Sequence, residues 1–295
     1  MILSRVVLSV LSMVVGLVMV QSPAYSQSAD NVITWAGCGI TKKAFMAELA
    51  KAYETKTGIK VQLTGGGATR GIRDTVKLRM DMGGSCRMSL PGEDQSELYA
   101  SLHPVAWDAL VIITNKKNPV KNLTRQQIQD IYLGKVTNWR QVGGQNVPIH
   151  LYVRQGKISG VGYAIRQYLF EDSNIDFKTQ SKYTKRSSGP IERSVEKDIS
   201  GIAITGVSSA RKRDVKIISI DNKSPTYENV MKGKYGLYRP LYLVTTPTPS
   251  PKVKEFVSFA MSKEGRQIIR DNGTVPYMDA PQLMSKMLIY GFGVR

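Results

Sequence analysis

The feature that most constrains the fold of this chain is a glycine-rich segment between Ile59 and Arg87. It reads IKVQL, TGGGATRG and IRDTVKLRMDMGGSCR, which predicts a strand, a tight turn, a helix and a second short strand from Met82 to Arg87. A glycine turn that leads into a helix leaves backbone N–H groups unpaired and directs the positive end of the helix dipole outward. The segment therefore favours an α/β fold with a seat for an anion at the turn, or else only a tight connection.

The same alternation of strand and helix continues along the chain. Asn31 to Gly37 predicts a strand, Thr41 to Lys56 predicts a helix that Gly58 ends, and His103 to Asn115 predicts a long apolar strand. Later strands are predicted at VPIHLYVR, SGIAITG, VKIISI and RPLYLVTT, and later helices at NLTRQQIQDIYLG, ISGVGYAIRQYLF, SSGPIERSVEK and PKVKEFVSFAMSKEGRQIIRDNG. This order implies a parallel or mixed sheet covered by helices, with ligand sites at the carboxyl ends of the strands.

The first residues have the layout of a secretory signal peptide. One arginine, Arg5, precedes an apolar run from Val6 to Val20, and Ala24-Tyr25-Ser26 ends it with small outer residues. We predict a signal peptide over residues 1–26, with cleavage after Ser26 and export of the rest. The alternative is a membrane anchor, but the run falls short of the roughly 20 residues that span a bilayer.

The chain is strongly basic, with 41 Lys and Arg against 23 Asp and Glu and a net charge of +18. Removal of Arg5 with the signal peptide lowers this charge by one, to +17. The basic residues are spread along the chain, and no RNA-binding signature, zinc-finger spacing or heptad repeat accompanies them. We therefore predict a solvated basic surface that draws anions toward a cleft, and no nucleic-acid partner.

Taken in order, several segments resemble the phosphate-type solute-binding proteins of bacterial ABC importers. The longest is His103 to Gly144, which is close to a signature of that family. The glycine turn GGGATRGI, the strand tip DMGGSCR and the loop YVRQGKISGV resemble the ligand loops of the family, and the likeness extends from Asn31 to Pro276.

The resemblance implies a two-lobed type II periplasmic-binding fold of the α/β class. Each lobe would be a mixed sheet flanked by helices, with residues 27–115 and 236–295 in lobe 1 and residues 116–235 in lobe 2. Two hinge strands, VIITN and PLYLV, would join the lobes.

The resemblance also implies a function without chemistry. The chain would be a monomeric periplasmic receptor that holds a small inorganic or organic anion, phosphate first, and delivers it to an ABC permease. It implies no enzyme activity, cofactor or metal. No Ser-His-Asp order or metal-binding triad contradicts this expectation.

The ligand residues carried over from the family depart from its usual pattern. Ile40, Ala68, Cys86 and Val161 stand where the family usually has hydroxyls or an acid. The predicted ligand-binding positions are Thr41, Ala68, Thr69, Arg70, Ser85, Cys86, Arg87, Arg154, Ser159 and Gly160. The missing hydroxyls also leave open a sensory or partner-binding protein of the same fold, with a changed ligand and a membrane sensor as its partner.

Cys38 and Cys86 are the two cysteines of the chain, and both are predicted at strand tips of the same lobe. In an exported protein an even number of cysteines predicts a disulfide. The alternative is a pair of soft thiolate ligands for a thiophilic solute, such as a metalloid oxyanion or a soft metal.

Overall fold

A computed structural model describes residues 31–290 of the chain. The predicted signal peptide and its cleavage point at Ser26 lie outside the described residues. Within them, no helix is both long enough and apolar enough to cross a bilayer.

The strands form a mixed sheet in which β4 is shared by two halves. The strands are β1 (Val32–Gly37), β2 (Lys60–Gly65), β3 (Met82–Ser85), β4 (Ser101–Asn115), β5 (Asn122–Leu123), β6 (His150–Arg154), β7 (Lys182–Lys185), β8 (Gly201–Gly206), β9 (Val215–Ile220), β10 (Tyr238–Thr245) and β11 (Val275–Pro276). Half-sheet A has the order β2-β1-β3-β10-β4, and half-sheet B has the order β4-β8-β6-β7 with β9 also on β4. Residues 101–109 of β4 pair with β10, whereas residues 110–115 pair with β8 and β9.

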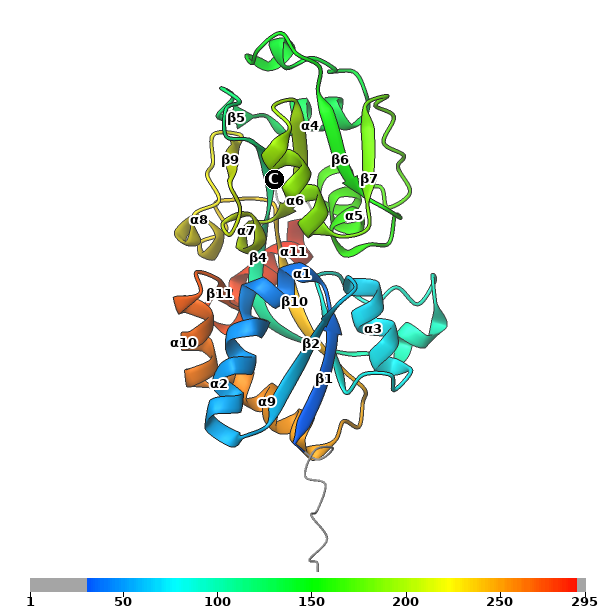
Figure 1. Cartoon of the computed structure of the whole chain (residues 1–295), viewed down its shortest axis with the longest axis vertical. Helices are drawn as coiled ribbons and strands as arrows, with labels where there is room; N and C mark the ends of the chain where they lie inside the picture. Colours follow the sequence, from blue (N-terminus) through cyan, green and yellow to red (C-terminus); the bar gives the residue numbers. More distant parts are fainter. Residues whose placement is uncertain (1–30, 291–295) are drawn as a thin grey trace, which may run out of the picture. The chain divides into compact units, whose positions relative to one another are not determined.

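Helices flank both half-sheets (Figure 1). They are α1 (Gly39–Thr41), α2 (Ala47–Thr57), α3 (Ala68–Val76), α4 (Arg125–Tyr132), α5 (Gly160–Ile165), α6 (Ser188–Lys197), α7 (Val207–Ala210), α8 (Tyr227–Met231), α9 (Pro251–Met261), α10 (Lys263–Asp271) and α11 (Gln282–Tyr290). In Figure 1, α2 and α3 lie on opposite sides of β1 and β2, with α9 and α10 packed against α2, and α5 and α6 lie beside β6 and β7. The predicted alternation of strands and helices is confirmed, with β4 running between the two groups.

Two predicted elements are shorter than the sequence suggested. The helix after the glycine turn ends at Val76 instead of near Met80, because Leu78 adopts a left-handed φ of 56°. The backbone N–H groups of Arg79 and Met80 then both donate to the Asp74 carbonyl, which closes the turn. The following strand ends at Ser85, so Cys86 and Arg87 belong to the loop beyond it.

The parallel pairing in half-sheet A brings three strand ends to one edge. β1 lies between β2 and β3 and runs parallel to both, so the loops after Gly37, Gly65 and Ser85 emerge together. The helix α3 packs closely over this edge, since a Cβ atom at Gly71 would lie 2.4 Å from the Gly84 carbonyl oxygen and 2.9 Å from that of Ala36. The absent side chain at Gly71 therefore sets how closely the glycine turn approaches its neighbours.

The substitution Gly71→Ala tests this close approach. We expect a loss of about 1–3 kcal/mol in the free energy of unfolding, because the added methyl group meets rigid backbone rather than a movable side chain. Gly65→Ala, in the same turn, is the matched control, since nothing lies within 4 Å of its added Cβ atom. Urea unfolding of both variants measures the difference, and equal stabilities would contradict the packing argument.

Candidate functional site

Loops from both half-sheets meet at one buried place. On half-sheet A, the Cys38 N–H donates to the Gly84 carbonyl at 3.1 Å and the Gly67 N–H donates to the Gly37 carbonyl at 3.1 Å, which ties the three loops together. On half-sheet B, Gly160 begins α5. A Cβ atom at Gly160 would lie 2.3 Å from the sulfur of Cys86 and 3.0 Å from the Cβ of Ala68. The predicted positions Ala68, Cys86 and Gly160 are therefore brought together.

Cys38 and Cys86 lie side by side at this place as buried free thiols. The Thr41 N–H donates to the Cys38 sulfur at 3.3 Å, and the Thr41 hydroxyl lies 3.4 Å from the same sulfur while it donates to the Cys38 carbonyl. Burial would raise the pKa of Cys38, but the Cys86 thiol, the Thr41 groups and the positive charge of Arg239 outweigh it and lower this pKa to about 6. The pKa of Cys86 is raised well above its ordinary value, first by its hydrogen bond to Cys38.

The two thiols therefore titrate as a coupled pair, in which the proton of Cys38 is the first to leave. The predicted disulfide between Cys38 and Cys86 is not formed in this structure, although the predicted closeness of the two residues is observed.

Two buried guanidinium groups lie beside the thiols. Arg239, from β10, is fully buried, and its Nη1 donates to the carbonyls of Cys86 and Gly160, both at 3.1 Å. Its Nε and Nη2 find no hydrogen-bond acceptor among the described residues. Arg154, at the end of β6, is only 9% exposed, and its Nε likewise has no acceptor within residues 31–290. Burial lowers the pKa of Arg154, and the negative charge on Cys86 and Cys38 opposes that effect.

Asp108 partly balances the charge of Arg239. Its Oδ2 lies 3.8 Å from Nη2 of Arg239, and its Oδ1 accepts from the backbone N–H and the hydroxyl of Ser208 at 3.2 and 2.6 Å. Burial raises the pKa of Asp108 despite these partners.

Arg239 and Asp108 were not among the predicted site residues. Each is a charged residue inside an otherwise apolar strand, YRPLYLV for Arg239 and VAWDALV for Asp108. A charge at a buried strand position is rare unless it is paired, and that pattern is the signal that could have found them.

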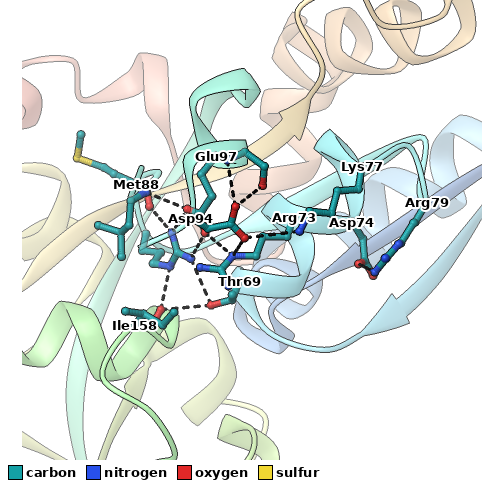
Figure 2. A network of polar contacts seen from close by, with 12 residues as sticks. Thr69, Arg73, Asp74, Lys77, Arg79, Met88, Asp94, Glu97 and Ile158 are labelled. Atoms are coloured by element: carbon teal, nitrogen blue, oxygen red, sulfur yellow. Dashed lines mark hydrogen bonds and ion pairs between the residues drawn. The ribbon is translucent and has the colours of Figure 1, made fainter. Parts of the chain in front are cut away.

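Arg87 makes a structural ion pair rather than leaving its guanidinium open. Its Nη1 and Nη2 donate to the two carboxylate oxygens of Glu97 at 2.7 and 2.9 Å, and both side chains are fully buried. Its Nε donates to the Ile158 carbonyl at 2.9 Å, across from half-sheet A to the loop before α5. Thr69 joins the same contact, since its hydroxyl donates to the Ile158 carbonyl at 3.3 Å (Figure 2). Nη1 also donates to the Met88 carbonyl at 2.7 Å and Nη2 to the Thr69 hydroxyl at 3.2 Å, so all five N–H donors of Arg87 have partners within the protein.

The other predicted positions make local contacts. Arg70 has a side chain that is 42% exposed, and it pairs with Asp74 at 2.9 Å and with the Gly65 carbonyl at 3.0 Å. The Ser85 hydroxyl donates to the Arg87 carbonyl at 2.7 Å, and the Ser159 hydroxyl donates to the Gly156 carbonyl at 3.2 Å. The structure therefore brings Thr41, Ala68, Cys86, Arg154 and Gly160 to one centre and directs Arg70 away from it.

A second contact between the halves lies at Lys43, which follows α1. Its ammonium group donates to Glu192 at 3.1 Å and to the Ser209 hydroxyl at 2.8 Å, and both of these residues belong to helices of half-sheet B. Glu192 is fully buried and also accepts from Thr205 and Arg213. The Arg87–Ile158 and Lys43–Glu192 contacts therefore both join the two halves directly.

The comparisons with known proteins agree on one family. The family model described as PBP superfamily domain matches residues 24–264. The phosphate-binding protein PstS of Bacillus subtilis is 22% identical over 86% of this chain and 83% of its own length. The PstS of Borreliella burgdorferi is 28% identical over 57% of this chain, and the match spans 63% of that protein.

Solved structures give the same result. A phosphate ABC transporter substrate-binding protein from Clostridium perfringens, with bound phosphate, aligns with a TM-score of 0.76 and 27% identity over 83% of this chain and 99% of its own. An ABC-type phosphate transport receptor from Vibrio cholerae aligns with a TM-score of 0.64 and 28% identity over 82% and 99% of the two chains. These matches confirm the predicted resemblance and the predicted two-lobed α/β fold.

The buried Arg87–Glu97 pair predicts an acid-sensitive stability. Burial opposes ionisation of Glu97, but the donors on Arg87 and the Leu90 N–H outweigh it and hold its pKa below the ordinary value of 4.5. A lowered pKa stabilises the fold above pH 4.5, and this contribution is lost as the pH falls through the folded-state pKa.

We therefore expect Glu97→Gln to lose about 3–5 kcal/mol of unfolding free energy at pH 7, because it leaves the Arg87 charge buried and unpaired. The loss should shrink as the pH falls through the folded-state pKa of Glu97, below which the wild-type carboxylate is protonated as well. Urea unfolding over a series of acidic pH values measures this, with the exposed neighbour Glu93→Gln as the control. A loss that stays the same throughout the series would contradict the electrostatic explanation.

Proposed function

This chain belongs to the PBP superfamily domain family, and on that premise we propose that it is an exported, non-enzymatic receptor for a small oxyanion. The observation that carries the proposal is the pair of buried guanidinium groups, Arg154 and Arg239, whose Nε–H donors point to no acceptor among the described residues. Buried donors without acceptors cost free energy, so a site that keeps them is suited to a ligand that supplies oxygen atoms. Phosphate is the first candidate, because the relatives and structures named above bind phosphate.

The backbone around the guanidiniums supports an anionic ligand. Gly67 adopts a φ of 90° and precedes the first turn of α3, whose N–H groups face the same strand edge as Cys38 and Cys86. A helix start of this kind favours negative charge. Two positive side chains and a helix start therefore converge on one buried place.

We propose that the ligand enters by a hinge motion between two lobes. Lobe 1 would comprise residues 27–115 and 236–295, and lobe 2 residues 116–235, so that β4 and the start of β10 carry the hinge. Opening would break contacts that join the halves, among them the Arg87 to Ile158 hydrogen bond and the Lys43 to Glu192 ion pair.

The partner would be an ABC permease in the membrane, and the receptor would act as a periplasmic monomer after cleavage near Ser26. A sensory or partner-binding role with a changed ligand is the second candidate. The specific observation that favours it is that Ala68 and Cys86, which meet Gly160 there, carry no hydroxyl group, and neither does Val161, the buried residue after Gly160. A membrane sensor would then replace the permease as partner.

The disulfide between Cys38 and Cys86 stays a prediction for the exported protein. The two thiols are adjacent, so their oxidation in a disulfide-forming compartment would require little backbone movement. Thiol quantification of the purified mature protein without reductant decides its state.

Phosphate binding should depend on Arg154 and should stabilise the fold. At a hundredfold excess over Kd, a ligand adds about 2.7 kcal/mol to the unfolding free energy, which raises Tm by several degrees. We expect Arg154→Ala to weaken binding about tenfold or more, since it removes a charge-assisted donor. Calorimetric titration with phosphate, sulfate, arsenate, molybdate and a phosphonate measures the affinity and the selectivity.

Arg140→Ala is the matched control, because Arg140 is exposed on a turn of half-sheet B and carries the same charge. An equal loss in both variants would point to general electrostatic attraction instead of a site. If no anion of the panel binds or shifts Tm, the oxyanion receptor is the wrong function.

A further inference from the structure

The adjacent thiols of Cys38 and Cys86 have no role in holding phosphate. A phosphate site needs neutral or positive donors, whereas these sulfurs lie near Arg154 and Arg239, and the lowered pKa of Cys38 favours a thiolate there. A thiolate at this position competes with an oxyanion for the same guanidiniums. The pair therefore points to a ligand that reacts with sulfur as well as with N–H donors.

We propose that Cys38 and Cys86 form a dithiol site for a trivalent metalloid hydroxide, of arsenic or antimony, with a remaining hydroxyl oxygen held by Arg154 and Arg239. The proposal rests on the receptor function above and names a ligand class for the same cleft. Its two parts match the two unusual features of the place: a pair of buried thiols that are hydrogen-bond partners of each other, and buried N–H donors without acceptors among the described residues.

The surrounding charge selects a metalloid hydroxide over a soft metal cation. Two buried guanidiniums lie close enough to the sulfurs to stabilise negative charge on them, and they would repel Cu⁺ or Zn²⁺ at the same position. Zn²⁺ also requires about four protein ligands, and no group of three or more Cys, His, Asp or Glu side chains suited to a metal occurs in residues 31–290. A metalloid hydroxide is neutral, so the guanidiniums do not repel it, and it needs only the two sulfurs as protein ligands because it keeps one hydroxyl oxygen.

The binding step balances without an oxidant. The Cys38 thiolate and the Cys86 sulfur each form a bond to arsenic in As(OH)₃, and two As–O bonds break. The Cys86 proton leaves with one hydroxyl as water, and the second hydroxyl leaves as hydroxide, which takes a proton from solvent. Arsenic stays trivalent and keeps one hydroxyl, whose oxygen can accept from a guanidinium.

The geometry also provides access when the lobes open. The Cys86 sulfur is covered by Gly160, which has no side chain and belongs to the opposite half, so withdrawal of α5 would uncover the sulfur. Thr41 would keep the Cys38 sulfur in place, since its N–H and hydroxyl both contact that sulfur or its carbonyl.

The test is a titration of the full mature chain, reduced with a phosphine and kept without oxygen, with sodium arsenite and separately with antimonyl tartrate. We expect binding of one equivalent that protects both thiols from a thiol reagent, and no protection by Zn²⁺. Cys38→Ser and Cys86→Ser should each weaken arsenite binding at least about a hundredfold, because each removes a direct ligand. Arg154→Lys should weaken it about tenfold while both thiols remain.

The control for thiol number is the double variant C86S/T55C, since Thr55 is exposed on α2 and keeps two thiols in the chain that are not adjacent. It should bind no better than Cys86→Ser. The wild-type chain oxidised to the Cys38–Cys86 disulfide should not bind arsenite at all. This control uses no substitution, so a folding defect of a variant cannot explain its result.

The proposal would be overturned if C86S/T55C bound arsenite as tightly as the wild type or if the reduced wild type did not bind arsenite. Protection of the thiols by Zn²⁺ would also overturn it. Failure of phosphate to bind while arsenite protects the thiols would overturn phosphate as the ligand and leave the dithiol site standing. Phosphate binding without arsenite binding would overturn the dithiol site and leave phosphate as the ligand.

Discussion

The buried guanidinium of Arg239 is the interaction on which the rest of this structure depends. It extends from β10, one of the strands beside the shared strand β4, and donates to backbone carbonyls on both halves, at Cys86 and at Gly160. Its charge is only partly balanced by Asp108 at 3.8 Å. A charge buried in this way needs further negative partners, and the lowered pKa of Cys38 favours a thiolate that would be one. Arg239 therefore ties the loop at Cys86 to the start of α5 on the other half and adds to the causes that lower the pKa of Cys38.

Much of the fold could be predicted from sequence, because its signals are local. Thr124 and Gln127 form the capping box that begins α4, Gly58 ends α2 in a left-handed conformation, and the glycine turn leads into α3 as expected. Loop convergence at the strand ends followed from parallel pairing. The contacts that could not be predicted involve residues far apart in the sequence. Nothing within DMGGSCR shows that the carboxylate of Glu97, ten residues later, accepts from the guanidinium of Arg87.

The same limit explains the mixed outcome at the candidate site. Resemblance to the family predicted ligand loops at Ala68, Cys86, Arg154 and Gly160, and in the structure these four residues lie near one another. It could not tell which arginine keeps open donors. Arg70 finds Asp74 one helical turn away, whereas the Nε of Arg154 lies where no acceptor of the described residues reaches it. An arginine is therefore left with donors for a ligand only where neighbouring elements supply no acceptor, and those neighbours come from distant parts of the sequence.

Replacing hydroxyls with Ala68, Cys86 and Val161 changes the chemistry of the cleft more than its shape. A hydroxyl donates to an oxyanion and stays neutral, whereas the Cys86 thiol is one of the groups that lower the pKa of Cys38 and so favour a thiolate there. A thiolate at Cys38 is attracted to the same guanidiniums as an oxyanion. A solute that only accepts hydrogen bonds must displace that thiolate from the guanidiniums, whereas a solute that bonds to sulfur uses it, so the two ligand classes make opposite demands on the same two cysteines.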